Sequence, residues 1–215
     1  MGTSMTGDPG STDDLLRRAG AGDPNALAEL FARYRDRLRR MVKLRLDRRL
    51  QGRVDPSDVL QEAQLEITRR AAEYAADPPV PPFLWLRLIT GQRLTALHRR
   101  HLGARMRNAG QEIALHRGPI PQATSLSLAE MLLGRLTSPT QAAQRAEVWL
   151  LLQEALNGMD PIDREVLTLR HFEELSNAEV AQVLGLSKTA ASNRYIRALE
   201  RLREALAGIP GLLAP

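Results

Sequence analysis

The stretch of residues 176–206, SNAEVAQVLGLSKTAASNRYIRALERLREAL, constrains the fold more than any other part of the chain. Ser176 and Glu179 have the spacing of a capping box, which predicts that a helix begins there. Gly185 predicts where this helix ends, because glycine adopts a left-handed backbone without steric cost. Ser187 then predicts the start of a second helix. Two helices joined by a turn of about three or four residues are typical of a helix-turn-helix.

The second of these helices presents short polar and positively charged side chains away from its expected buried stripe. Such a face suits the major groove of DNA, where base edges are read by hydrogen bonds and apolar contacts. The alternative is a helical hairpin inside a larger all-helical core, in which these polar residues only meet solvent. The residues of this face are Lys188, Thr189, Ser192, Asn193, Ile196 and Arg197.

Composition narrows the class of protein. A chain of 215 residues suits one large domain or two small ones, and its net charge of +5 allows an anionic partner. The chain has no cysteine and only four scattered histidines, so neither a disulfide scaffold nor a zinc site is expected. No apolar run approaches the roughly 20 residues of a membrane span, and the N-terminus lacks a signal-peptide pattern. We therefore expect a cytoplasmic protein without membrane insertion, metal or cofactor.

A helix with a polar, acidic patch is expected after residue 55. Asp55 and Pro56 have the order of an N-cap followed by a first-turn proline. Glu62 and Glu66 place two carboxylates one turn apart, but no histidine or nucleophile lies nearby in the sequence. Acid–base catalysis by this patch is therefore not expected. The patch consists of Asp58, Gln61, Glu62 and Glu66.

Residues 83–107 predict a long helix with an apolar first half and a basic second half. Phe83 and Trp85 follow directly on a proline-rich loop, residues 77–82. An aromatic ring beside a row of cations is suited to stacking an unpaired base and holding its phosphates. The alternative is that both aromatic side chains belong to the core, and for Phe83 we favour it.

The predicted fold is all-α, with two small helical domains joined by a flexible linker and a helix-turn-helix in the second domain. We expect a disordered tail over residues 1–12, an N-terminal domain over 13–107, a linker over 108–137, a C-terminal domain over 138–207 and a tail over 208–215. The linker contains an apolar patch, residues 126–136, that is suited to forming a helix against a partner. Ser138 and Gln141 predict a further capping box behind it.

Four blocks of this sequence resemble the bacterial sigma-70 family, in particular the small extracytoplasmic-function (ECF) sigma factors. DVLQEAQLEI is similar to the family's D-L-V-Q-E-T-F-L helix, and FLWLRLITGQRLTALHRR to its F-x-x-W-L-x-x-I-A-x-N-x-x-x-D-x-x-R-R helix. LNGMDPIDREVLTLRHFEELSNAEVAQVLGLS resembles the L-x-x-L-P-x-x-x-R-E-V-L start of the family's −35 domain, and SKTAASNRYIRALERLR its recognition helix. The resemblance covers about residues 13–107 and 138–206.

The resemblance implies core RNA polymerase and promoter DNA as partners, with an anti-sigma factor as a further candidate, and no chemistry by the chain itself. It places Asp58, Gln61 and Glu62 against the polymerase clamp helices. It assigns capture of −10 bases to Trp85, Gln92, Arg93, Arg99 and Arg100. For the −35 element it implies Lys188, Arg194 and Arg197 on phosphates and Ser192, Asn193 and Ile196 on base edges, with Thr189 beside them.

The chain departs from the family pattern at three positions. Gln64 stands where the family usually has Phe, Gln92 replaces the usual Asn, and Ala96 replaces the usual Asp. The last two bear on which −10 bases are read.

Two other classes of protein remain open at this point. The first is a helix-turn-helix regulator that binds operator DNA without polymerase, but this interpretation gives residues 58–107 no role. The second is an all-helical interaction or structural protein, in which the basic faces only contact solvent. Binding to core polymerase followed by initiation at a defined promoter separates all three.

Overall fold

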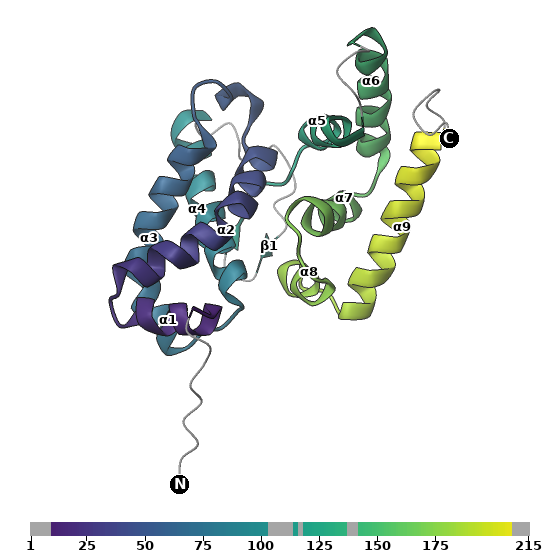
Figure 1. The fold of residues 1–215 in the computed structure, drawn as a ribbon. Coiled ribbons are helices and arrows are strands. Elements are labelled where there is room, and N and C mark those ends of the chain that lie inside the picture. The colour runs from purple at the N-terminus through teal and green to yellow at the C-terminus, as the bar shows by residue number, and fades with distance from the viewer. Residues whose placement is uncertain (1–9, 103–113, 116–117, 137–141, 208–215) are drawn as a thin grey trace. The chain divides into compact units, whose positions relative to one another are not determined.

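The computed structural model describes residues 10–102, 114–115, 118–136 and 142–207. Within these ranges the chain is helical apart from two short antiparallel strands, β1 (Ala114–Leu115) and β2 (Gly118–Pro119). The predicted all-α class is therefore confirmed. The chain divides into two compact units, one of Met1–Val42 and Asp47–Met106, the other of Lys43–Leu46 and Arg107–Pro215. Figure 1 shows the helices of each unit.

The first unit is built on long helices whose starts follow from local sequence. The Asp55 carboxylate accepts a hydrogen bond from the backbone N–H of Ser57, and the Asp58 carboxylate accepts one from the N–H of Asp55, as in a capping box. The elements of this unit are α1 (Thr12–Gly20), α2 (Pro24–Arg45), η1 (Arg48–Leu50), α3 (Pro56–Ala76) and α4 (Pro82–Leu102).

Helix α4 lies at the centre of the core of the first unit, because its first half buries side chains on almost every side. It packs along α3, and α3 in turn packs against α1. At that second contact Gly20 comes so close to α3 that an added Cβ would lie 2.3 Å from the Cβ of Ala75. A side chain at Gly20 would therefore force the two helices apart.

The second unit contains a helix within the interval predicted to be a linker. Helix α5 packs against α6, and its Leu128 and Ala129 are fully buried. The apolar patch at residues 126–136 therefore forms a helix, as its composition allowed. The predicted capping box at Ser138 lies outside the described residues. The helical elements are α5 (Ser125–Leu136), α6 (Ala142–Gly158), α7 (Pro161–Leu167), the π-helical η3 (Thr168–Phe172), α8 (Asn177–Leu184) and α9 (Lys188–Ala207).

The sequence pattern of α6 predicts Leu150 and Leu156 on its inner side, and the structure confirms only the second. Leu156 is buried together with Leu152, whereas Leu150 is 59% exposed. Apolar residues occur on all sides of this helix, so its sequence does not indicate which side meets the core.

The described part of the chain offers no helix that is both long and apolar enough to span a bilayer. The same residues contain no group of three or more His, Cys, Asp or Glu side chains that would hold a metal ion.

Candidate nucleic-acid interface

The helix-turn-helix forms through the local contacts that its sequence predicts. The Ser176 hydroxyl accepts a hydrogen bond from the backbone N–H of Glu179 at 3.2 Å, and the Glu179 carboxylate accepts one from the N–H of Ser176 at 2.7 Å. Gly185 ends α8 with a left-handed backbone, at a φ of 64°. The capping box and the glycine stop are both confirmed.

The start of α9 is tied to its own cap and to α8. The Ser187 hydroxyl accepts a hydrogen bond from the backbone N–H of Ala190 at 3.1 Å, as the sequence predicts. The side-chain amide of Asn177, at the start of α8, donates to the carbonyl of Lys188 at 2.8 Å. The Asn177 bond holds the N-terminal turns of α8 and α9 together. The N-terminal turn of the second helix, the recognition helix, is the part that contacts base edges in the major groove.

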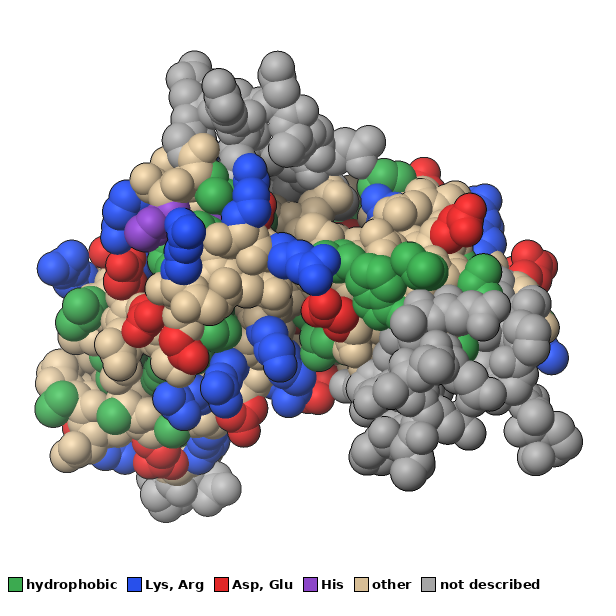
Figure 2. All heavy atoms as spheres, turned by 90° about the horizontal axis from the view of Figure 1, so that it is seen from above, with side chains coloured by type: hydrophobic (Ala, Val, Ile, Leu, Met, Phe, Trp, Pro, Cys, Tyr) green, Lys and Arg blue, Asp and Glu red, His purple; other side chains and the backbone are tan. Residues whose placement is uncertain are grey.

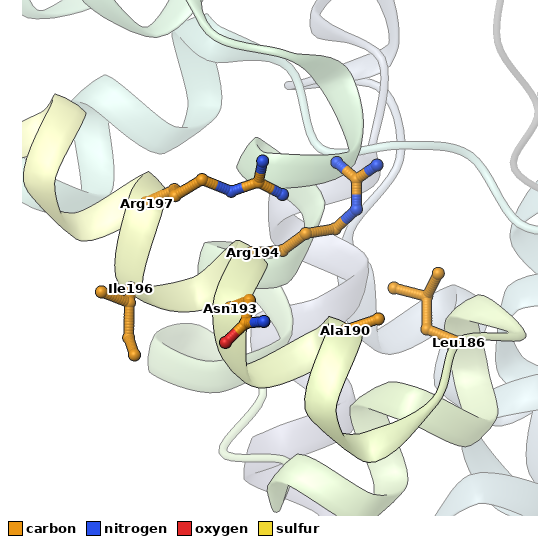
Figure 3. A pocket seen from close by; sticks show the side chains of 6 residues that line it. All are labelled: Leu186, Ala190, Asn193, Arg194, Ile196 and Arg197. Atoms are coloured by element: carbon orange, nitrogen blue, oxygen red, sulfur yellow. The ribbon is translucent and has the colours of Figure 1, made fainter.

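Helix α9 turns most of its predicted DNA-binding residues to solvent. Ala191 and Ala198 are fully buried and form its inner stripe. On the outer face, Ile196 is 50% exposed although it is apolar. Figure 3 shows Asn193 and Ile196 projecting from the helix, with Arg197 beside them. The exposed members of the predicted set are Lys188, Thr189, Asn193, Ile196 and Arg197, and Ser192 is half-buried.

Arg194 differs from its neighbours on α9, because its guanidinium is engaged inside the protein. Its Nη1 lies 2.9 Å from Oδ1 of Asp163 and 3.7 Å from Oδ1 of Asp160. Asp160 is the N-cap of α7, and Asp163 lies in the first turn of that helix. Asp163 is only 3% exposed, and Arg201 approaches its other oxygen at 3.5 Å. The sequence treats Arg194 and Arg197 alike, whereas the structure separates them.

The aromatic residue predicted to stack a base, Trp85, lies in the core of the first unit. Trp85 is 7% exposed, and its ring stacks on that of Tyr74 with centroids 4.1 Å apart and planes 10° from parallel. The Tyr74 hydroxyl donates to the carbonyl of Val80 at 2.6 Å, and burial raises the pKa of Tyr74 to about 12. This packing favours the alternative in which Trp85 is a core residue. Phe83, for which the core was expected, is also buried.

Two of the cations predicted to meet −10 DNA are paired with acids of α3. Nη2 of Arg93 lies 3.1 Å from Oε2 of Glu66, and Nη1 of Arg100 lies 3.3 Å from Oε1 of Glu62. Figure 2 shows basic and acidic side chains interspersed over one face of the first unit. Arg99 is exposed and Gln92 is half-buried. Sequence reasoning missed these pairs because it treated α3 and α4 separately.

His98, in the second half of α4, is turned into the core. It is buried, and its Nε2 accepts a hydrogen bond from the backbone N–H of Asp47 at 3.2 Å. Burial lowers the pKa of His98 below its usual value near 6.5, which favours the neutral imidazole.

The predicted polymerase-binding patch on α3 includes an apolar residue that the sequence analysis left out. Leu65 is 64% exposed. It follows Gln61 by four positions and Glu62 by three, so it shares their helix face. Gln61 is exposed and Glu62 half-buried, while Asp58 also serves the capping box of α3. An exposed leucine amid polar groups is the composition expected of a protein-binding surface.

Comparisons with known proteins agree with this geometry. Residues 149–202 match the family described as Sigma-70, region 4. The ECF RNA polymerase sigma factor SigK of Mycobacterium ulcerans (strain Agy99) is 30% identical over 206 residues, which cover 94% of this chain and 98% of SigK. SigD of Mycobacterium bovis is 27% identical over 94% of this chain and 86% of its own. The solved structure of CnrH in complex with the cytosolic domain of CnrY shares the fold, with a TM-score of 0.55, 22% identity, and coverage of 91% of this chain and 97% of that one. The chain belongs to the ECF RNA polymerase sigma factor family.

Proposed function

We propose that this protein binds core RNA polymerase and directs it to specific promoters, reading the −35 element with α9 and the −10 element with α4. The exposed face of α9 carries the proposal. It lies in a helix-turn-helix within the segment that matches Sigma-70, region 4, and the whole chain aligns with a full-length ECF sigma factor.

Recognition of the −35 element rests on the outward side chains of α9. Lys188 and Arg197 are exposed cations that reach phosphates and fix the register of the helix on the duplex. Asn193 and Ile196 lie between them and meet base edges, with Thr189 and Ser192 on the flanks.

Opening of the −10 element rests on the second half of α4. Non-template bases must leave the stack there, at a cost of a few kcal/mol, which polymerase binding helps to offset. Arg93, Arg99 and Arg100 supply the positive charge for the displaced strand, and Gln92 an amide for a base. A stacking role for Trp85 requires its ring to leave Tyr74, so we place Trp85 outside this set.

Binding to polymerase rests on the exposed face of α3 that contains Asp58, Gln61, Glu62 and Leu65. Carboxylates and an amide around one apolar side chain suit a basic helical partner with an apolar centre. This surface and the DNA-reading surface are on different helices, so polymerase and −35 DNA do not compete for the same side chains. The protein acts in this scheme by binding and strand separation.

The test is reconstitution with core RNA polymerase. The full chain is mixed with core polymerase and a library of DNA duplexes with a randomised upstream region, and run-off transcripts are sequenced. The proposal requires a stable complex and transcripts from templates that share two spaced elements. Binding to duplex DNA without polymerase, and no transcripts with it, would identify a helix-turn-helix regulator instead.

A further inference from the structure

Arg194 and Arg197 lie on the same helix and have the same chemistry, yet their surroundings differ. We infer that Arg194 is a positioning residue that seats the recognition helix on α7 through Asp163, and that it does not bind phosphate. This inference rests on the proposed function and deepens it, because it assigns DNA contact to Arg197 and the orientation of α9 to Arg194.

The ion pair between Arg194 and Asp163 is short and buried on the acid side, as expected of a contact that stabilises the fold. Its Oδ1 lies 2.9 Å from Nη1 of Arg194, its Oδ2 lies 3.5 Å from Nη1 of Arg201, and its side chain is 4% exposed. The two arginines stand seven positions apart, two turns along α9, and converge on one carboxylate. Asp163 also occupies the first turn of α7, where the helix dipole favours a negative charge.

Burial makes this pair costly to break. A carboxylate with so little access to water is stable only while it is paired and hydrogen-bonded. If Arg194 turned toward a phosphate, Asp163 would keep only the longer contact with Arg201. Arg197, by contrast, is exposed and makes no salt bridge with any residue that the structure describes, so it reaches DNA without losing a partner. Figure 3 shows the two guanidinium groups on the same side of α9.

The ion pair acts beside the apolar stripe of α9. In the first turns of the helix this stripe consists of Ala191, and Ala198 and Leu202 continue it further along. Because the alanine side chains are small, the polar contacts beside them help to fix the rotation of the helix about its axis. On the other side of this stripe, the Tyr195 hydroxyl lies 3.1 Å from Nε2 of His171. Hydrogen bonds to base edges tolerate only small displacements, so a small rotation of α9 would misplace Asn193 and Ile196 together.

The test measures the salt dependence of DNA binding by the complete complex of this chain with core polymerase. The probe is a duplex selected from a library randomised over the −35 region by the wild-type complex. The variants are Arg194→Ala, Asp163→Asn and their combination, with Arg197→Ala as the matched control. Arg197→Ala should lower the slope of log Kobs against log salt by about 0.9, as expected for one lost phosphate contact. Arg194→Ala should leave the slope unchanged and lower the affinity by about tenfold at every salt concentration.

Asp163→Asn separates the two roles most sharply, because it frees the Arg194 guanidinium without removing it. A positioning role predicts a loss of affinity similar to that of Arg194→Ala, and no further loss in the double variant. A phosphate-binding role predicts unchanged or tighter binding with a steeper slope. That result, a lower slope in Arg194→Ala, or additive losses would each overturn the inference.

Asp163→Asn answers the question by itself if Arg194→Ala does not fold, since it changes neither the size nor the shape of the side chain. The proposed function can also fail separately. A wild-type complex that selects no duplex overturns both statements, whereas wild-type selection with any of the three contrary variant results overturns only the role of Arg194.

Discussion

At the scale of single residues, Trp85 has the sequence context of a base-stacking residue, but its ring packs on Tyr74 in the core. Trp85 follows a proline-rich loop and precedes a basic half-helix, but its ring is covered by Tyr74 at 4.1 Å. Stacked aromatic rings contribute about 0.5–1.5 kcal/mol beyond the area that they bury.

Trp85→Ala should lower the free energy of unfolding by about 3–5 kcal/mol, because it leaves a cavity where the largest side chain of α4 was buried. Trp85→Phe, which keeps a ring on Tyr74, should cost much less. Urea denaturation measures both changes. A Trp85→Ala variant with normal stability that opens promoters slowly in permanganate footprinting would restore the base-stacking role.

Alkaline pH should destabilise the protein through Tyr74. Its pKa is about 12 in the folded state, against the ordinary value of 10.0 that applies to the unfolded chain. The phenol is protonated in both states below pH 10, so its full contribution is present there. As the pH rises from 10 to 12 the unfolded state ionises first, and stability falls by at most about 2–3 kcal/mol. In Tyr74→Phe this part of the decrease should be absent from unfolding curves measured between pH 9 and 12.

At the scale of elements, the contact between α1 and α3 depends on the absence of one side chain. Gly20→Ala should destabilise the protein by about 1–3 kcal/mol, because its Cβ would lie 2.3 Å from that of Ala75. Gly158→Ala is the control, since Gly158 also ends a helix but has nothing within 4 Å of an added Cβ. Thermal unfolding should show a loss for the first variant only. A rescue of Gly20→Ala by Ala75→Gly would assign the loss to this contact.

The recognition helix makes a prediction about sequence preference. Asn193→Ala should relax the preference at one position of the −35 element by about 1–3 kcal/mol, because an exposed amide on the outer face of α9 pairs with a base edge. Selection from a randomised −35 library by wild-type and variant complexes measures this change. An equal loss of affinity on every sequence would mean that Asn193 does not read a base.

At the scale of the whole molecule, polymerase binding is assigned to α3 and −35 DNA binding to α9, so a substitution in one helix should impair one activity and leave the other unchanged. Gln61→Ala combined with Glu62→Ala should weaken binding to core polymerase and change stability by about 0.5 kcal/mol or less. The Arg100–Glu62 pair does not alter this expectation, because it is solvent-exposed and such pairs contribute little.

Glu73→Ala is the matched control for the polymerase surface, because Glu73 is an exposed acid of the same helix that lies three turns beyond Glu62. It should leave polymerase binding unchanged when affinity is measured by titration of labelled core enzyme. If the double variant loses stability and binding to the same extent, the patch on α3 is structural.

Features that depend on residues a few positions apart could be predicted from the amino-acid sequence. The N-cap at Asp55, the capping box at Ser176, the left-handed Gly185 and the outward face of α9 all belong to this class. They could be predicted because a cap or a turn is complete within one or two turns of backbone. The same local patterns, read together, also indicated the family.

Contacts between side chains far apart in the sequence could not be predicted in this way. Arg194 and Asp163 are 31 positions apart, and Arg100 and Glu62 are 38 apart, so their pairing depends on how whole helices pack. The buried side of α6 and the burial of Trp85 were decided in the same way. A helix can turn any part of an apolar or charged surface toward its neighbour, and the choice is made by the fit between the two surfaces and not by the sequence of either one.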